Sequence, residues 1–117
     1  MRVIARSTLS KFVETLTGRK DKAAVKSALD AWYYEAVHAA WRSSRDVKRA
    51  YATASIVDAE RVVFNIKGNS YRLVASIDYE RRAVFIKWLG SHREYDKIDV
   101  RVVQYGNQAY QKRSGSR

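Results

Sequence analysis

The stretch RVVFNIKGNSYRLVASIDYERRAVFIKWL, residues 61–89, contains three apolar segments separated by short turns. All three are rich in β-branched and aromatic residues, which is typical of strands. Lys67-Gly68-Asn69 supplies a turn between the first two segments, and Glu80-Arg81 joins the last two closely enough for an antiparallel hairpin. We therefore expect a small antiparallel sheet, with a weaker strand at 99–105 (DVRVVQY).

The residues that precede this stretch have a helical period instead. One helical face carries four apolar residues at i, i+3, i+4 and i+7, namely Leu9, Phe12, Val13 and Leu16. Ser7 is the expected N-cap of this helix and Gly18 its stop. Asp21 is expected to cap a second helix that ends near Trp41, and Ser43 or Ser44 a third over 45–52. The fold class is therefore α+β, with N-terminal helices packed on one face of the sheet.

Length and composition favour one small domain, residues 1–105, followed by a basic, polar tail at 106–117 that we expect to be flexible or to bind a partner. The chain has no cysteine, which excludes disulfides and thiolate metal sites. No apolar run approaches the ~18 residues of a membrane span, and residues 1–10 lack the apolar segment of a signal peptide. We expect a cytoplasmic protein that does not associate with membranes.

Charge indicates the class of partner. The 23 Lys+Arg residues exceed the 12 Asp+Glu residues, so the net charge is +11. Residues 61–117 hold 12 basic and 5 acidic residues and so carry +7 of that excess. A basic excess on so small a domain attracts polyanions, above all the phosphate backbone of nucleic acids. A solubility function of the charge is the alternative.

Two basic residues are notable within the strands. Alternation places Arg72 on the sheet face opposite to Leu73, Ala75 and Ile77. Lys87 is predicted to share a face with Ala83, Phe85 and Leu89, and it is the only charge within its apolar run. Its amine either extends to the rim of the sheet or points into a cleft on the open face.

The polar segment SHREYDKID, residues 91–99, directly follows the last apolar segment. His92, Tyr95 and Asp96 stand at i, i+3 and i+4, so one helical turn would place them on the same side. Histidine exchanges protons near neutral pH, and a carboxylate can orient or charge the imidazole. With two histidines in the chain and no clear third ligand, the set is poor for metal, and an ordinary solvated turn would give the same pattern.

These residues match the requirements of RNA cleavage by the RNA's own 2′-hydroxyl, which needs neither metal nor cofactor. Such a site must remove one proton, stabilise a crowded phosphorane and protonate the leaving 5′-oxygen. It also benefits from an aromatic or arginine plane that stacks on bases. The residues alone leave an endoribonuclease and a non-catalytic RNA- or ribosome-binding module both open. A DNA-binding regulator is less well supported, because no short-turn recognition helix is evident.

Two motifs resemble a known family. FNIKGNSYRLV at 64–74 and VFIKWLGSHREYDKID at 84–99 resemble, in order and spacing, the HigB family of toxins from bacterial type II toxin–antitoxin systems. The resemblance spans roughly residues 1–103. It implies a RelE-like fold and an mRNA endoribonuclease (an mRNA interferase) that acts on translating ribosomes and inhibits translation. It also implies neutralisation by a HigA-type helix-turn-helix antitoxin, through which the complex binds operator DNA.

The resemblance also implies roles for individual residues. His92 is expected to be the general base or acid, with Asp96 orienting it. Lys87 and Arg72 are expected to stabilise the phosphate and the transition state. Tyr95 would stack on a base or transfer a proton. Four further residues are expected on the RNA-binding surface, Asn69 mainly by shaping the hairpin: Asn69, Lys97, Arg93 and Lys67.

Overall fold

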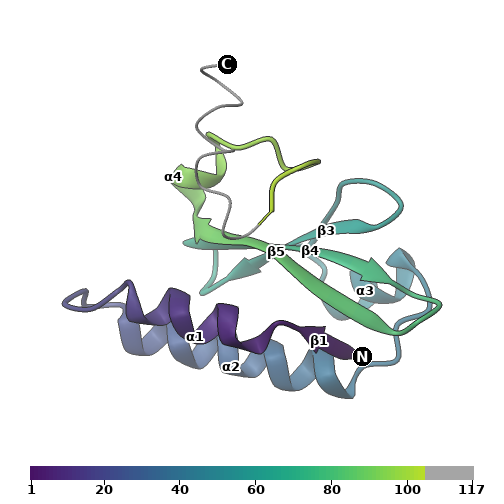
Figure 1. The fold of residues 1–117 in the computed structure, drawn as a ribbon, viewed down its shortest axis with the longest axis horizontal. Helices are drawn as coiled ribbons and strands as arrows, with labels where there is room; N and C mark the ends of the chain where they lie inside the picture. The colour runs from purple at the N-terminus through teal and green to yellow at the C-terminus, as the bar shows by residue number, and fades with distance from the viewer. Residues whose placement is uncertain (105–117) are drawn as a thin grey trace.

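The structure, a computed structural model, describes residues 1–104. Helices and a single sheet account for most of this range (Figure 1). In chain order the elements are β1 (Arg2–Ile4), α1 (Arg6–Glu14), α2 (Lys22–His38), α3 (Ser44–Ala50), β2 (Ser55–Ile56), β3 (Arg61–Ile66), β4 (Tyr71–Asp78), β5 (Ala83–Ser91) and α4 (His92–Tyr95). The α+β class is therefore confirmed.

The sheet has the strand order β1-β5-β4-β3-β2. The three strands predicted from residues 61–89 form its centre as two antiparallel hairpins. The short β1 adds to the edge of β5 in parallel, and the two-residue β2 pairs with the other edge, along β3. The sheet is thus mostly antiparallel, as expected.

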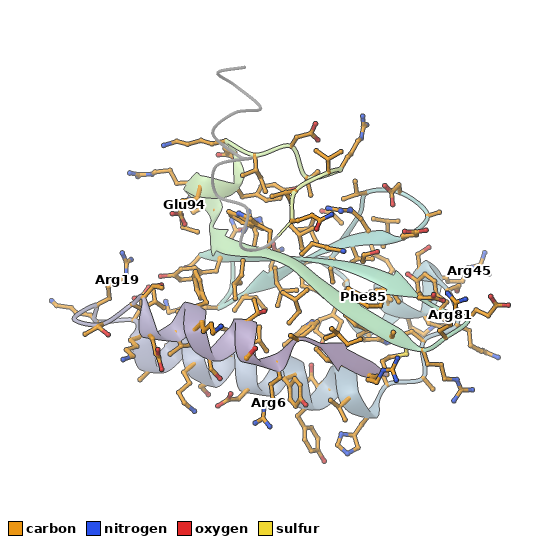
Figure 2. All side chains as sticks on the ribbon, viewed as in Figure 1. Arg6, Arg19, Arg45, Arg81, Phe85 and Glu94 are labelled. Carbon is orange, nitrogen blue, oxygen red and sulfur yellow. The ribbon has the colours of Figure 1, made fainter. Side chains whose placement is uncertain are left out.

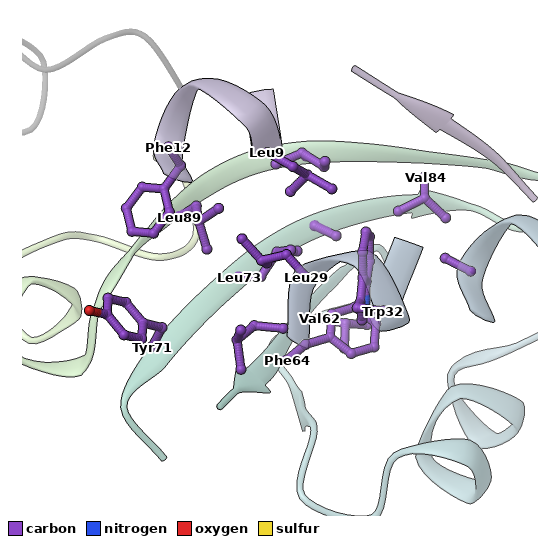
Figure 3. Packing of buried hydrophobic residues seen from close by; sticks show 14 of the residues in the cluster. Leu9, Phe12, Leu29, Trp32, Val62, Phe64, Tyr71, Leu73, Val84 and Leu89 are labelled. Atoms are coloured by element: carbon purple, nitrogen blue, oxygen red, sulfur yellow. The ribbon is translucent and has the colours of Figure 1, made fainter. Parts of the chain in front are cut away.

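The helices α1 and α2 lie side by side across one face of the sheet (Figure 1). The main core fills the space between these two helices and the sheet. There Trp32 of α2 packs edge-on against Phe64 of β3, with 5.4 Å between the ring centroids (Figure 3). Leu29 and Leu73 are almost completely buried beside this pair. The apolar faces predicted for α1 and for β4 are faces that the structure buries.

Several predicted helix ends were wrong. α1 begins at Arg6, with Ala5 rather than Ser7 at the N-cap, and α2 ends at His38 rather than near Trp41. Trp41 is nevertheless buried, because it packs on Phe64 after the chain has left the helix. Asp21 does occupy the N-cap of α2, but its carboxylate accepts hydrogen bonds from other partners.

The weak strand expected at 99–105 is also wrong over its described residues. Residues 100–102 form a turn, and Val103 is buried against the second face of the sheet with Val63, Val74 and Trp88. This smaller cluster is a second core on the face opposite to α1 and α2. The basic tail at 106–117 lies outside the described residues.

Candidate active site

A β-bulge in the β4–β5 hairpin determines where Lys87 lies. Val74 pairs with Trp88 and the next residue, Ala75, pairs with Ile86, so Lys87 is the extra residue of β5. Bulges redirect side chains and are common beside active sites. The prediction that Lys87 and Leu89 share a face was wrong, because the extra residue shifts the alternation and turns Leu89 into the main core. Lys87 stays half-buried with Phe85, its Nζ 5.7 Å from that ring's centroid.

The polar segment after β5 begins with a capped helical turn. Ser91 Oγ accepts a hydrogen bond from the Glu94 backbone N–H at 3.1 Å, and Glu94 Oε1 accepts one from the Ser91 N–H at 2.9 Å. This reciprocal pair is a capping box, which fixes the start of α4. The His92 N–H donates to the Ser70 carbonyl at 3.0 Å and so joins α4 to the β3–β4 hairpin.

Arg72 and Tyr95 meet on the side of the sheet that α4 covers. The Arg72 Cζ atom lies 5.9 Å from the centroid of the Tyr95 ring. One guanidinium nitrogen of Arg72 donates to the Asn69 carbonyl at 2.9 Å, so the hairpin turn helps to hold the side chain. The Tyr95 ring also lies 6.2 Å from that of Trp88, centroid to centroid. Burial raises the pKa of the Tyr95 hydroxyl, with Arg72 lowering it and Asp96 raising it further.

His92, Tyr95 and Asp96 fall on one helical turn, as their spacing predicts, with Asp96 at the C-cap. Their side chains are not joined to each other by hydrogen bonds among residues 1–104. The exposed His92 instead lines a hollow of 440 Å³ together with Arg19, Asp21 and Tyr71. Asp96 is near enough to Tyr95 to affect the pKa of its hydroxyl.

The expected site residues therefore lie along the end of β5 and not in one closed pocket. Arg72 pairs with Gly90, three residues beyond Lys87. At about 3.3 Å per residue, Lys87 and Arg72 are separated by roughly 10 Å along the strand. The structure brings Arg72 and Tyr95 together, with Asp96 beside them, whereas Lys87 and His92 stand at the two ends of the set.

The residues expected to contact RNA lie at the same edge and are exposed. Lys67 starts the β3–β4 turn with a positive φ of 54°, followed by Gly68 at 62°. Asn69 supplies the carbonyl that holds Arg72, which agrees with a role in shaping the hairpin. Within the described chain none of the three basic members, Lys67, Arg93 and Lys97, forms an ion pair.

Several residues that support this edge were not predicted from the sequence. The Trp88 ring lies next to the Tyr95 ring, and the absence of a side chain at Gly90 leaves room for the Trp88 ring. Arg61 donates to the carbonyls of Val100 and Val103 at 3.0 and 2.8 Å and holds residues 98–103 over the second face. The S-x-x-E pattern at 91–94 could have revealed the capping box, but no local signal indicates the contacts of Arg61.

Two further properties of residues 1–104 concern membrane-spanning helices and metal-binding groups. None of their helices has the length and apolar character that a membrane span requires. No group of three or more His, Asp and Glu side chains in this range is arranged to hold a metal ion.

A comparison with protein families identifies the chain. The family model described as "HigB_toxin, RelE-like toxic component of a toxin-antitoxin system" matches residues 25–98, more than half of the chain. Amino-terminal helices on a mostly antiparallel five-strand sheet agree with the RelE-like fold. The chain belongs to the HigB family of RelE-like toxins of toxin–antitoxin systems. Membership implies an antitoxin partner. No curated protein sequence matches the chain.

Proposed function

We propose that this toxin is an endoribonuclease that cleaves mRNA on the translating ribosome, without a metal or cofactor, and thereby inhibits translation. The observation that carries the proposal is the packing of the Arg72 guanidinium over the Tyr95 ring beside the exposed turn that holds His92 and Asp96. A cation, an aromatic plane and proton-transfer groups are thus neighbours at one strand end. Metal-free RNA cleavage requires proton transfer and stabilisation of the phosphorane charge, and an aromatic plane can stack on a base.

The RNA 2′-hydroxyl is the nucleophile in the proposed reaction. It loses its proton, attacks the adjacent phosphorus, and the 5′-oxygen departs with a proton supplied by the enzyme. His92 is the general base or acid, because imidazole both accepts and donates protons near neutral pH. Asp96, four residues further on the same turn, orients or charges that imidazole.

Arg72 and Lys87 stabilise the charge that develops on the phosphorane oxygens. A guanidinium has five N–H donors, and the hydrogen bonds of Arg72 within residues 1–104 use only one of its nitrogens, Nη1. The remaining donors are available to a phosphate. The bulge keeps Lys87 out of the main core, so its amine can approach the RNA from the opposite end of the set.

Tyr95 offers either a stacking surface or a hydroxyl. Its contacts with Arg72 and Trp88 favour stacking, because both neighbours restrain the orientation of the ring. Its raised pKa keeps the hydroxyl protonated at neutral pH, so it acts as a donor rather than a base.

The net charge of +11 supports a ribosomal site of action, because rRNA and mRNA present a dense phosphate surface. Asn69, Lys67, Arg93 and Lys97 extend the contact to the RNA backbone. In the proposed function the antitoxin is a helix-turn-helix protein of the HigA type, and the complex reaches operator DNA only through it. The site of action places the toxin in the cytoplasm.

Inducible expression tests this assignment. Expression of the wild-type protein should arrest growth, and His92→Ala or Lys87→Ala should relieve the arrest while the protein stays folded by circular dichroism. His38→Ala is the matched control, because His38 lies on α2 and, among the described residues, its ring bonds only the Tyr34 carbonyl of its own helix, at 2.8 Å. It should remain toxic. Folded His92 and Lys87 variants with full toxicity would show that the site is misassigned.

A further inference from the structure

A second polar site lies where three segments meet beside α4. The hollow of 440 Å³ that His92 lines is formed by the α1–α2 loop, the start of β4 and the first residues of α4. Figure 2 shows Arg19 of the loop at the same end of the molecule as Glu94 of α4. Arg19 and Asp21 precede residue 25, where the family match begins.

The loop is fixed to the sheet by one carboxylate. Asp21 accepts a hydrogen bond from the Tyr71 hydroxyl at 2.7 Å and one from Arg19 Nε at 3.2 Å. These bonds, that from Tyr71 first, lower the pKa of the Asp21 carboxyl, so it is ionised at neutral pH. Tyr71 is buried and is the neighbour of Arg72 on β4. The position of Arg19 is therefore tied to the strand that carries a proposed catalytic residue.

The hollow has more positive than negative charge. Arg19 uses Nε for Asp21, which leaves its two terminal nitrogens available, and its side chain is 61% exposed. Arg93 is exposed and has no ion-pair partner in the described range. His92 adds a third basic side chain, whereas Asp21 is the only acidic residue among the described residues that line the hollow. The amino end of the 17-residue α2 also begins beside the hollow, at Lys22, and helix amino ends favour anions.

We infer that this hollow binds a phosphodiester of single-stranded RNA next to the one that is cleaved, with Arg19 as its principal contact. The inference rests on the proposed function, because His92, the proposed general base or acid, lines the hollow. Arginine suits the task, since its planar donors match the oxygens of a phosphate.

Binding of a fully 2′-O-methylated RNA oligonucleotide tests the inference without cleavage, because the nucleophile is blocked. Arg19→Gln should weaken binding roughly tenfold, the cost of one charge-assisted hydrogen-bonded contact. It should also reduce the slope of log K against log salt by about 0.7, the value for one phosphate contact on a single strand. Lys20→Gln is the matched control, since it removes the same charge from the adjacent exposed position outside the hollow. It should weaken binding less than about twofold.

Asp21→Asn distinguishes the effect of the Asp21 charge on RNA binding from the effect of the loop's conformation. It removes the negative charge but keeps an Oδ1 atom that can still accept the hydrogen bond from Arg19 Nε, so binding at neutral pH should be unchanged or tighter. Equal weakening by Arg19→Gln and Lys20→Gln would overturn the inference, because it would reduce the effect to net charge. Weakening by Asp21→Asn to the level of Arg19→Gln would also overturn it, since Arg19 would then act only through the loop.

Failure of the Arg19 subsite and failure of the proposed endonuclease function give different experimental results. If the methylated RNA binds in an Arg19-dependent way and unmodified RNA is never cut, the subsite stands and the endonuclease proposal fails. If RNA is cut but Arg19→Gln and Lys20→Gln bind alike, only the subsite fails.

Discussion

At the scale of single residues, the candidate site depends on close contacts that few side chains would permit. A Cβ atom added to Gly90 would lie 2.4 Å from Trp88 Cη2 and 3.0 Å from Glu94 Oε1. Trp88 is buried, and Glu94 belongs to the capping box. Gly90 is also the strand partner of Arg72. The absence of a side chain at this residue therefore allows Trp88, α4 and Arg72 to lie close together.

Gly90→Ala should reduce the free energy of unfolding by about 1–3 kcal/mol, the usual cost of overpacking. The measurement is urea denaturation of the purified protein. Trp88→Phe removes the ring atoms that the new methyl group would meet, so the double variant should lose less stability than the sum of the two single variants. Additive losses would show that the Gly90–Trp88 contact is not the cause.

At the scale of elements, the segment after α4 is held by a side chain far away in the sequence. Arg61 of β3 donates to the carbonyls of Val100 and Val103. Val103 thereby joins Trp88 in the smaller core, against which Tyr95 also packs. The arrangement explains why residues 99–104 do not form the predicted strand. Their carbonyls bond a guanidinium instead of a neighbouring strand.

Arg61→Met should cost about 1–3 kcal/mol of stability, because two partly buried carbonyls lose a charged donor. It should also increase amide hydrogen exchange in residues 98–103 and in α4 more than elsewhere. Arg101→Met is the matched control: it removes the same charge from an exposed residue of the same segment, and it should leave exchange in α4 unchanged. Equal amide hydrogen exchange in Arg61→Met and Arg101→Met would show that Arg61 does not hold this segment.

Local sequence signals predict part of the fold and part of the candidate site. The three central strands and their hairpins were predicted because alternation and turn residues are local signals. The spacing of His92, Tyr95 and Asp96 is compatible with the helical turn that the structure shows. The bulge at Lys87 was not, since it depends on the register against Ala75, and it reversed the predicted face of Leu89. The approach of Arg19 to His92 has no local signal, because 72 residues separate them in sequence.

At the scale of the whole molecule, one bond connects the helical and the strand halves beside the site. The Asp21–Tyr71 hydrogen bond spans 50 residues. The pKa of the Asp21 carboxyl is lower in the folded state than its ordinary value, so the unfolded state binds more protons at acid pH. The stabilisation is present above about pH 4 and is lost as pH falls through the lower folded pKa.

Asp21→Asn should therefore be less stable than the wild-type protein at pH 7, and the difference should shrink as pH falls below about 4. Thermal denaturation of both proteins between about pH 2.5 and 7 measures it. Asp30→Asn removes an exposed ion pair with Lys26 at 2.8 Å and should have little effect at any pH. A difference between Asp21→Asn and wild type that persists unchanged in acid would exclude the carboxylate as the cause.

The proposed reaction as a whole has a chemical signature, because attack by the 2′-hydroxyl leaves a 2′,3′-cyclic phosphate on the upstream fragment. The most direct measurement incubates the purified toxin with translating ribosomes and identifies the ends of the mRNA fragments. Wild-type protein and His38→Ala should produce 2′,3′-cyclic phosphate ends, and folded His92→Ala should reduce the cleavage rate by about 10²–10⁴-fold, the usual contribution of general acid–base catalysis. Intact mRNA bound to the wild-type toxin, or His92→Ala cleaving at the wild-type rate, would contradict the proposed function or its site.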